Sequence, residues 1–106
     1  MDITKAKTIL DKLCERYEIP FSEVVSDSRL SELVAMRASF TYYAYNNLNM
    51  HNGIISRILN RDRTTMYNLL KTVENDKWRY DKNPSRKPLS LVMLDDIHDI
   101  EKQNTK

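Results

Sequence analysis

The chain has 106 residues, of which 30% are charged and 41% hydrophobic, and its net charge at pH 7 is +2. This length and composition exclude wholesale disorder and membrane helices, because no apolar run reaches the ~18 residues that cross a bilayer. One glycine and three prolines disfavour a β-rich fold, since hairpins need turn residues. The single cysteine permits no internal disulfide, so we expect a reducing compartment, with the cytoplasm as the default.

Apolar residues at helical spacing predict an all-α fold: a compact helical domain with a further amphipathic helix at its C-terminal end. The first helix is expected over residues 2–17, with Pro20 just past its end. A short turn of helix and a loop follow. A long helix is expected over residues 29–47, with Ser28 or Asp27 as its cap.

Two shorter helices are predicted over residues 50–59 and 63–76, with "NRD" as the turn between them. Residues 77–88 are polar and contain two prolines, which indicates a linker, and residues 89–103 form an amphipathic helix. The chain is thereby divided into a helix-turn-helix domain, a linker and a terminal segment: residues 1–76, 77–88 and 89–106. The predicted core consists of the apolar residues on the inner faces of these helices: Ile3, Ala6, Leu10, Leu13, Tyr17, Phe21, Val24, Val25, Leu33, Met36, Phe40, Tyr43, Ile54, Ile55, Ile58, Leu59, Met66, Leu69, Leu70, Val73, Leu89, Met93, Ile97 and Ile100.

Positive charge is concentrated in the middle of the chain. Residues 28–73 carry six cations and two anions, whereas residues 1–27 are net −2 and residues 74–106 are net zero. Five of those six cations are arginines, which make forked hydrogen bonds to phosphates and guanine edges that lysine cannot make. On charge alone, a solvated basic face accounts for this pattern as well as a nucleic-acid interface does.

The stretch "RDRTT" begins the helix that follows the predicted turn, and the apolar face of that helix starts only at the next residue. In a helix-turn-helix, the second helix lies in the major groove and touches base edges with its first residues. Arg61 and Arg63 can reach phosphate or guanine. Thr64 and Thr65 offer hydroxyls and methyls to DNA, and Asp62 can cap the helix or accept from cytosine. An ordinary helix start with a capping residue and solvated arginines would show the same pattern.

The stretch "NRDRTTMYNLLKTVE" resembles the signature of the C-terminal DNA-binding domain of the bacterial replication initiator DnaA, a Trp-repressor-like helix-turn-helix domain. That family shows R-D-H-T-T or a close variant, then an apolar pair and a helix bearing lysine or arginine. The resemblance extends back to about residue 4, through "YEIPFSEVV" and a long helix opened by an arginine, here Arg37. It implies a sequence-specific binder of double-stranded DNA in replication initiation or transcription regulation.

Carried over by position, the family's base-reading residues fall on Asp62, Arg63, Thr64 and Thr65. Its minor-groove arginine falls on Arg29, in the loop before the long helix. Three more basic residues of the motif helices and their turn are candidates for DNA contact, because positive charge gathers there: Arg57, Arg61 and Lys71.

The sequence departs from the family pattern at several places. Arg63 stands where the family has histidine, so the base read there is expected to differ. Asn60 replaces a glycine, and asparagine tolerates left-handed backbone better than most residues. The loop offers only Arg29 where the family has several basic residues, so weaker affinity for the minor groove is expected. The chain contains no G-x-x-x-x-G-K-[ST] motif, and we therefore expect no ATPase activity from it.

The resemblance does not explain the terminal helix. Its stripe of Met93, Ile97 and Ile100 can pack on the domain, pair with a second copy in a homodimer, or bind another protein. The alternative function is therefore an adaptor or inhibitor of the replication machinery that acts through this helix. His98 and Asp95 are three residues apart with no second histidine near, so we expect no metal and no cofactor. No nucleophile–base–acid set is recognisable, and we expect no enzyme.

Overall fold

The computed structural model describes residues 3–104, and within that range the chain forms six helices and no strand. The predicted all-α fold is thus confirmed. The helices are α1 (Ile3–Tyr17), α2 (Phe21–Val24), α3 (Ser31–Asn47), α4 (Asn52–Leu59), α5 (Arg63–Lys82) and α6 (Leu89–Asn104). In the same range, no helix is both long enough and apolar enough to span a bilayer.

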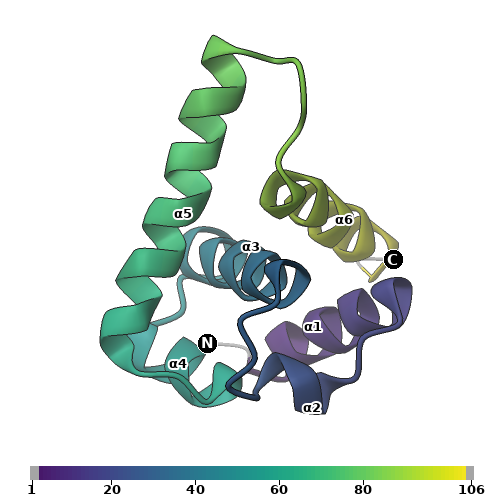
Figure 1. Ribbon diagram of the computed structural model, residues 1–106. Coiled ribbons are helices and arrows are strands. Elements are labelled where there is room, and N and C mark those ends of the chain that lie inside the picture. Colours follow the sequence, from purple (N-terminus) through teal and green to yellow (C-terminus); the bar gives the residue numbers. More distant parts are fainter. Residues whose placement is uncertain (1–2, 105–106) are drawn as a thin grey trace.

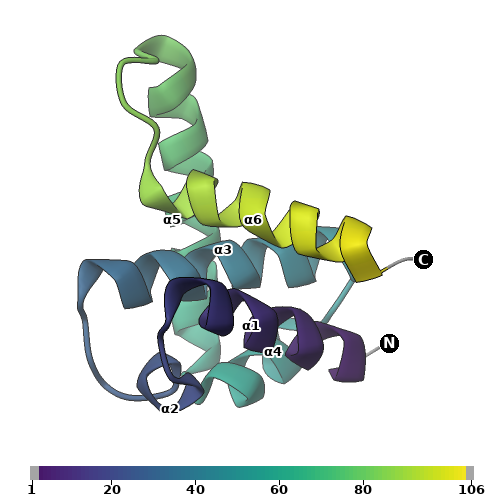
Figure 2. The same ribbon diagram turned by 90° about the vertical axis from the view of Figure 1, so that its right-hand side faces the viewer.

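Helix α3 lies at the centre of the fold (Figures 1 and 2). It packs against α6, α5, α4 and α2, while α1 and α6 also pack against each other. Because α3 is surrounded, ten of its 17 residues are buried, and they lie on all sides of the helix rather than along one stripe. Figure 1 shows α6 and α1 on one side of α3 and the pair of α4 and α5 on the other.

The predicted core residues are mostly buried, and Leu10, Met36, Phe40 and Tyr43 are fully so. Tyr17, Phe21, Ile54 and Ile58 are half-buried and pack against this core. Two core predictions were wrong. Ile3 is 46% exposed and Leu89 is 38% exposed, and each is the first residue of its helix.

Helix α5 is longer than the sequence pattern predicted. It continues six residues past the expected end at residue 76, so the predicted linker of residues 77–88 is correct only for residues 83–88. Tyr80, in this extension, packs against the core, and just before the extension the Ser90 hydroxyl of α6 donates to the Asp76 carboxylate at 2.6 Å. The helix stops before Pro84, because a residue that precedes proline is disfavoured in helical backbone.

Helix α6 buries its apolar stripe inside this chain. Met93, Ile97 and Ile100 are at most 2% exposed. The Arg16 guanidinium donates to Asp96 and Asp99, at 3.2 Å each, and Tyr43 donates to Glu101. Of the arrangements open to this helix, the structure shows packing on the domain, and the stripe that a partner-binding helix would need is not exposed.

Cys14 supplies a test of this core. Its thiol is 6% exposed and lies 3.9 Å from the Met36 sulfur. Burial, with smaller contributions from Asp11 and Glu15, raises the pKa of the Cys14 thiol to about 11.

We therefore predict that Cys14 reacts slowly with Ellman's reagent at pH 8, because only the thiolate attacks and its fraction is about 100-fold lower than in an ordinary thiol. The absorbance of the released thionitrobenzoate measures the reaction rate. Unfolding in urea should raise this rate to that of a free thiol. A native rate equal to that of a small thiol would show that Cys14 is not buried beside Met36 as described.

Candidate nucleic-acid interface

A three-residue turn, Asn60 to Asp62, joins α4 to α5. Asn60 has left-handed backbone angles, φ 55° and ψ 49°, which asparagine adopts more readily than most residues. The backbone N–H of Arg61 donates to the Ser56 carbonyl at 2.9 Å and that of Asn60 donates to Arg57 at 3.3 Å. These bonds close the end of α4 and turn the chain into α5 at the position expected from the sequence.

The amino end of α5 is open to solvent. Asp62, Arg63 and Thr64 are exposed, Thr65 is half-buried, and Met66 is the first fully buried residue of the helix. No side chain caps the first turn, which also lacks acidic residues, so its free N–H groups face outward with the positive end of the helix dipole. Helix α6 packs on α1 and α3 and leaves this end uncovered.

The loop between α2 and α3 is held by a buried arginine. Arg37 is 3% exposed and donates to four backbone carbonyls: its Nε to Val24 at 2.7 Å, its Nη1 to Ser28 at 2.7 Å, and its Nη2 to Ser26 at 3.0 Å and Glu23 at 3.2 Å. Burial lowers the pKa of Arg37, and the nearby positive charge of Arg61 lowers it further. Four hydrogen bonds to one charged group fix the course of a loop that has little secondary structure of its own.

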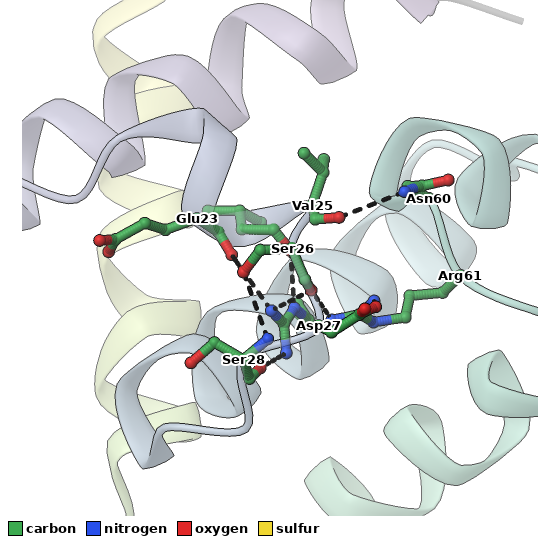
Figure 3. A network of polar contacts seen from close by, with 9 residues as sticks. Glu23, Val25, Ser26, Asp27, Ser28, Asn60 and Arg61 are labelled. Atoms are coloured by element: carbon green, nitrogen blue, oxygen red, sulfur yellow. Dashed lines mark hydrogen bonds and ion pairs between the residues drawn. The ribbon is translucent and has the colours of Figure 1, made fainter.

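The α4–α5 turn reaches across to the same loop (Figure 3). Asn60 Nδ2 donates to the Val25 carbonyl at 3.3 Å, and Arg61 donates to the Ser26 carbonyl. Arg61 also lies 3.6 Å from the Asp27 carboxylate. The side chain of Arg61, which the sequence predicted to reach phosphate or guanine, is only 15% exposed and holds the loop against the turn.

These contacts place Arg29 beside the amino end of α5. A hollow of about 430 Å³ separates the loop from α5, and it is lined by Asp27, Arg29, Val34, Arg37, Arg61, Thr65, Asn68 and Leu69. Three sequence-predicted contact residues, Arg29, Arg61 and Thr65, thus meet at one hollow. The sequence analysis missed Asn68, which lies three residues after Thr65 on the same helix face.

A second hollow of about 460 Å³ lies at the amino end of α5, lined by Tyr45, His51, Asn52, Arg63 and Tyr67. The Arg63 guanidinium packs close over Gly53, where an added Cβ would lie 3.2 Å from its Nη2. The Tyr45 and Tyr67 side chains are 45% and 60% exposed. Sequence reasoning did not select these tyrosines or His51, because the turn of the chain that brings them to Arg63 is not visible in any local pattern.

The remaining predicted contact residues lie further out. Lys71 is exposed on α5, about two turns beyond Arg63. Arg57 is exposed on α4 and lines a separate, mostly apolar groove of about 560 Å³ with residues of α1 and α2. The metal-ligand candidate of the sequence, His98, packs instead edge-to-face on Tyr43, with ring centroids 5.7 Å apart. Among residues 3–104, no three His, Cys, Asp or Glu side chains gather in a way that could hold a metal ion.

No protein-family model, no curated protein and no solved structure matches this chain. The resemblance to the DnaA domain therefore remains a prediction from the "RDRTT" motif and its setting. The case for function is made below from the open amino end of α5 and from the loop that Arg37 and Arg61 hold beside it.

The buried guanidinium of Arg37 yields a stability prediction. Arg37→Met keeps much of the apolar stem but removes every donor. The carbonyls of Val24 and Ser28 then lose the side chain that bonds them, while those of Ser26 and Glu23 keep their bonds from Arg61 and Ser26. We expect the free energy of unfolding to fall by about 3 kcal/mol. Urea unfolding followed by circular dichroism measures it, with Arg57→Met, at an exposed position, as the matched control. Equal unfolding midpoints for the two variants would contradict the role given to Arg37.

Proposed function

We propose that this protein binds double-stranded DNA sequence-specifically, with α4 and α5 as a helix-turn-helix and the amino end of α5 in the major groove. The observation that carries the proposal is the exposed, uncapped amino end of α5, which presents Arg63 and Thr64 directly after a three-residue turn. This helix end offers DNA the Arg63 guanidinium, the Thr64 hydroxyl and the free backbone N–H groups of the first turn. In a helix-turn-helix, these first residues of the second helix contact the bases.

Within this proposal the residues have separate roles. Arg63 is long enough to place its forked guanidinium on the O6 and N7 atoms of guanine. Thr64 offers a hydroxyl to a base or phosphate and a methyl to thymine. The backbone of Asp62 starts the helix, and its side chain makes no capping hydrogen bond, so the carboxylate is available to a cytosine amino group.

Arg29 supplies the second contact. It is exposed on the loop that Arg37 and Arg61 hold against the turn, so its backbone stands in a fixed relation to α5. Since the minor groove adjoins the major groove across a single backbone, an arginine in this position can enter it while α5 reads the major groove. The family resemblance independently assigns Arg29 to the minor groove.

The resemblance further suggests a role at a replication origin or an operator, without ATP chemistry, in the cytoplasm. The alternative of a protein-interaction adaptor acting through α6 receives no support from the structure, because Met93, Ile97 and Ile100 are buried against this chain's own helices. DNA binding through the opposite side of α3 is therefore the function that the geometry favours.

The identity of residue 63 decides the sequence preference. Arg63→Ala should weaken binding to the preferred duplex by about 1–3 kcal/mol and broaden the set of sequences bound, because the base-specific fork is lost. Selection of duplexes from a random pool identifies the site, and fluorescence anisotropy measures affinity. The control is Arg86→Ala, an exposed arginine in the loop beyond the far end of α5. Indistinguishable affinities and preferences for wild type and Arg63→Ala would sink the proposal.

A further inference from the structure

The hollow between the α2–α3 loop and α5 brings together three arginines that are not neighbours in the sequence. Its lining comes from three segments that are distant along the chain: the loop with Arg29, the start of α3 with Arg37, and the α4–α5 region with Arg61, Thr65 and Asn68. Among the described residues that line it, Asp27 is the one acid, and its carboxylate stands fully in solvent. Three guanidiniums therefore face one exposed carboxylate.

Two of these guanidiniums are forced together. Arg37 and Arg61 both donate to the same carbonyl oxygen, that of Ser26. Arg37 is 3% exposed and the side chain of Arg61 is 15% exposed, so water screens their repulsion poorly. Their N–H groups are satisfied by backbone carbonyls, which carry no net charge. The one carboxylate nearby, Asp27, lies 3.6 Å from Arg61 but stands fully in solvent, where water screens its attraction. An anion entering the hollow would lower this electrostatic energy.

The geometry of duplex DNA places an anion at this position. A single sugar–phosphate backbone separates a minor groove from the major groove beside it. If Arg29 enters the minor groove while Thr64 faces the adjacent major groove, that backbone must cross the surface between them. The surface between the Arg29 loop and the amino end of α5 is this hollow.

We infer that the hollow is a binding site for one phosphodiester group of the DNA backbone, an assignment that rests on the proposed duplex binding. Asn68 Nδ2 and the Thr65 hydroxyl donate to the phosphate oxygens from α5, and Arg29 closes over them from the loop. Arg37 and Arg61 keep their hydrogen bonds to the loop carbonyls and supply positive potential from behind. Asn68 is thereby a backbone-contact residue that carries no sequence information.

The test combines a variant with a modified duplex. Asn68→Ala removes the side-chain donor at an exposed position, and Asn75→Ala, exposed seven residues further along the same helix, is the matched control. The probe is the selected duplex with one phosphate at a time replaced by a neutral methylphosphonate. Anisotropy titrations at several salt concentrations give the affinity of each protein for each duplex.

We expect one methylphosphonate position, between the two grooves, to weaken wild-type binding about tenfold and to reduce the salt slope by about one. At that position the modification should reduce the affinity of Asn68→Ala for the duplex distinctly less than that of wild type, because both changes remove the same contact. Asn68→Ala should bind all sequences more weakly by a similar factor, whereas Asn75→Ala should match wild type. Equal sensitivity of wild type and Asn68→Ala to every methylphosphonate overturns the assignment.

A second measurement separates this site from the proposed function. Inorganic phosphate should raise the melting temperature of wild type more than that of Asn68→Asp, which brings a repelling carboxylate to the hollow; the control is Asn75→Asp. If wild type binds no duplex yet phosphate stabilises it selectively, the proposed DNA-reading function fails and an anion site stands. Equal stabilisation of wild type and Asn68→Asp overturns the phosphate site, whether or not the protein binds DNA.

Discussion

The geometry of the proposed interface depends on one buried group, the guanidinium of Arg37. The loop between α2 and α3 has only the four-residue helix α2 before it, and a segment so short cannot hold a fixed course by itself. By donating to Val24, Ser26, Ser28 and Glu23, one side chain of the central helix replaces the hydrogen bonds that regular structure would provide. Burying a charge is costly, and it is tolerated here because four carbonyls solvate it. The position of Arg29 relative to α5 is a consequence.

Helix α3 also separates the acidic part of the chain from the basic part. On one side, the carboxylates of α6 are matched by α1, with Arg16 between Asp96 and Asp99. On the other side, the α4–α5 turn and the loop bring Arg29, Arg61 and Arg63 to neighbouring surfaces. The acidic helix therefore neither covers nor faces the amino end of α5. A net charge of +2 for the chain thus conceals a local excess that is available to a polyanion.

Local pattern was sufficient for most of the fold and for part of the site. Helical spacing located α1, α4 and α6 and much of the core, because each of these helices has one apolar face that shows in the sequence. Helix α3 was also located, although it is buried on all sides and only part of its buried surface was predicted. It failed at the end of α5, where a polar segment stays helical and Tyr80 packs against the core, a long-range contact that no local rule includes. Local pattern also did not predict the hydrogen bond from Arg61 to the Ser26 carbonyl, because the two residues are 35 positions apart. Asn68 was missed for the same reason, since its significance comes from the loop opposite.

Rigidity has a particular value for a chain with so little net charge. A strongly basic protein gains affinity for DNA over a wide surface, and its contacts need not be exact in position. This chain concentrates few cations in one place, so under the proposed function each must meet its phosphate or base edge without further adjustment. Ordering a free loop on binding would cost conformational free energy that a handful of contacts supplies only with difficulty. The hydrogen bonds from Arg37, Asn60 and Arg61 remove that cost in advance, when the protein folds.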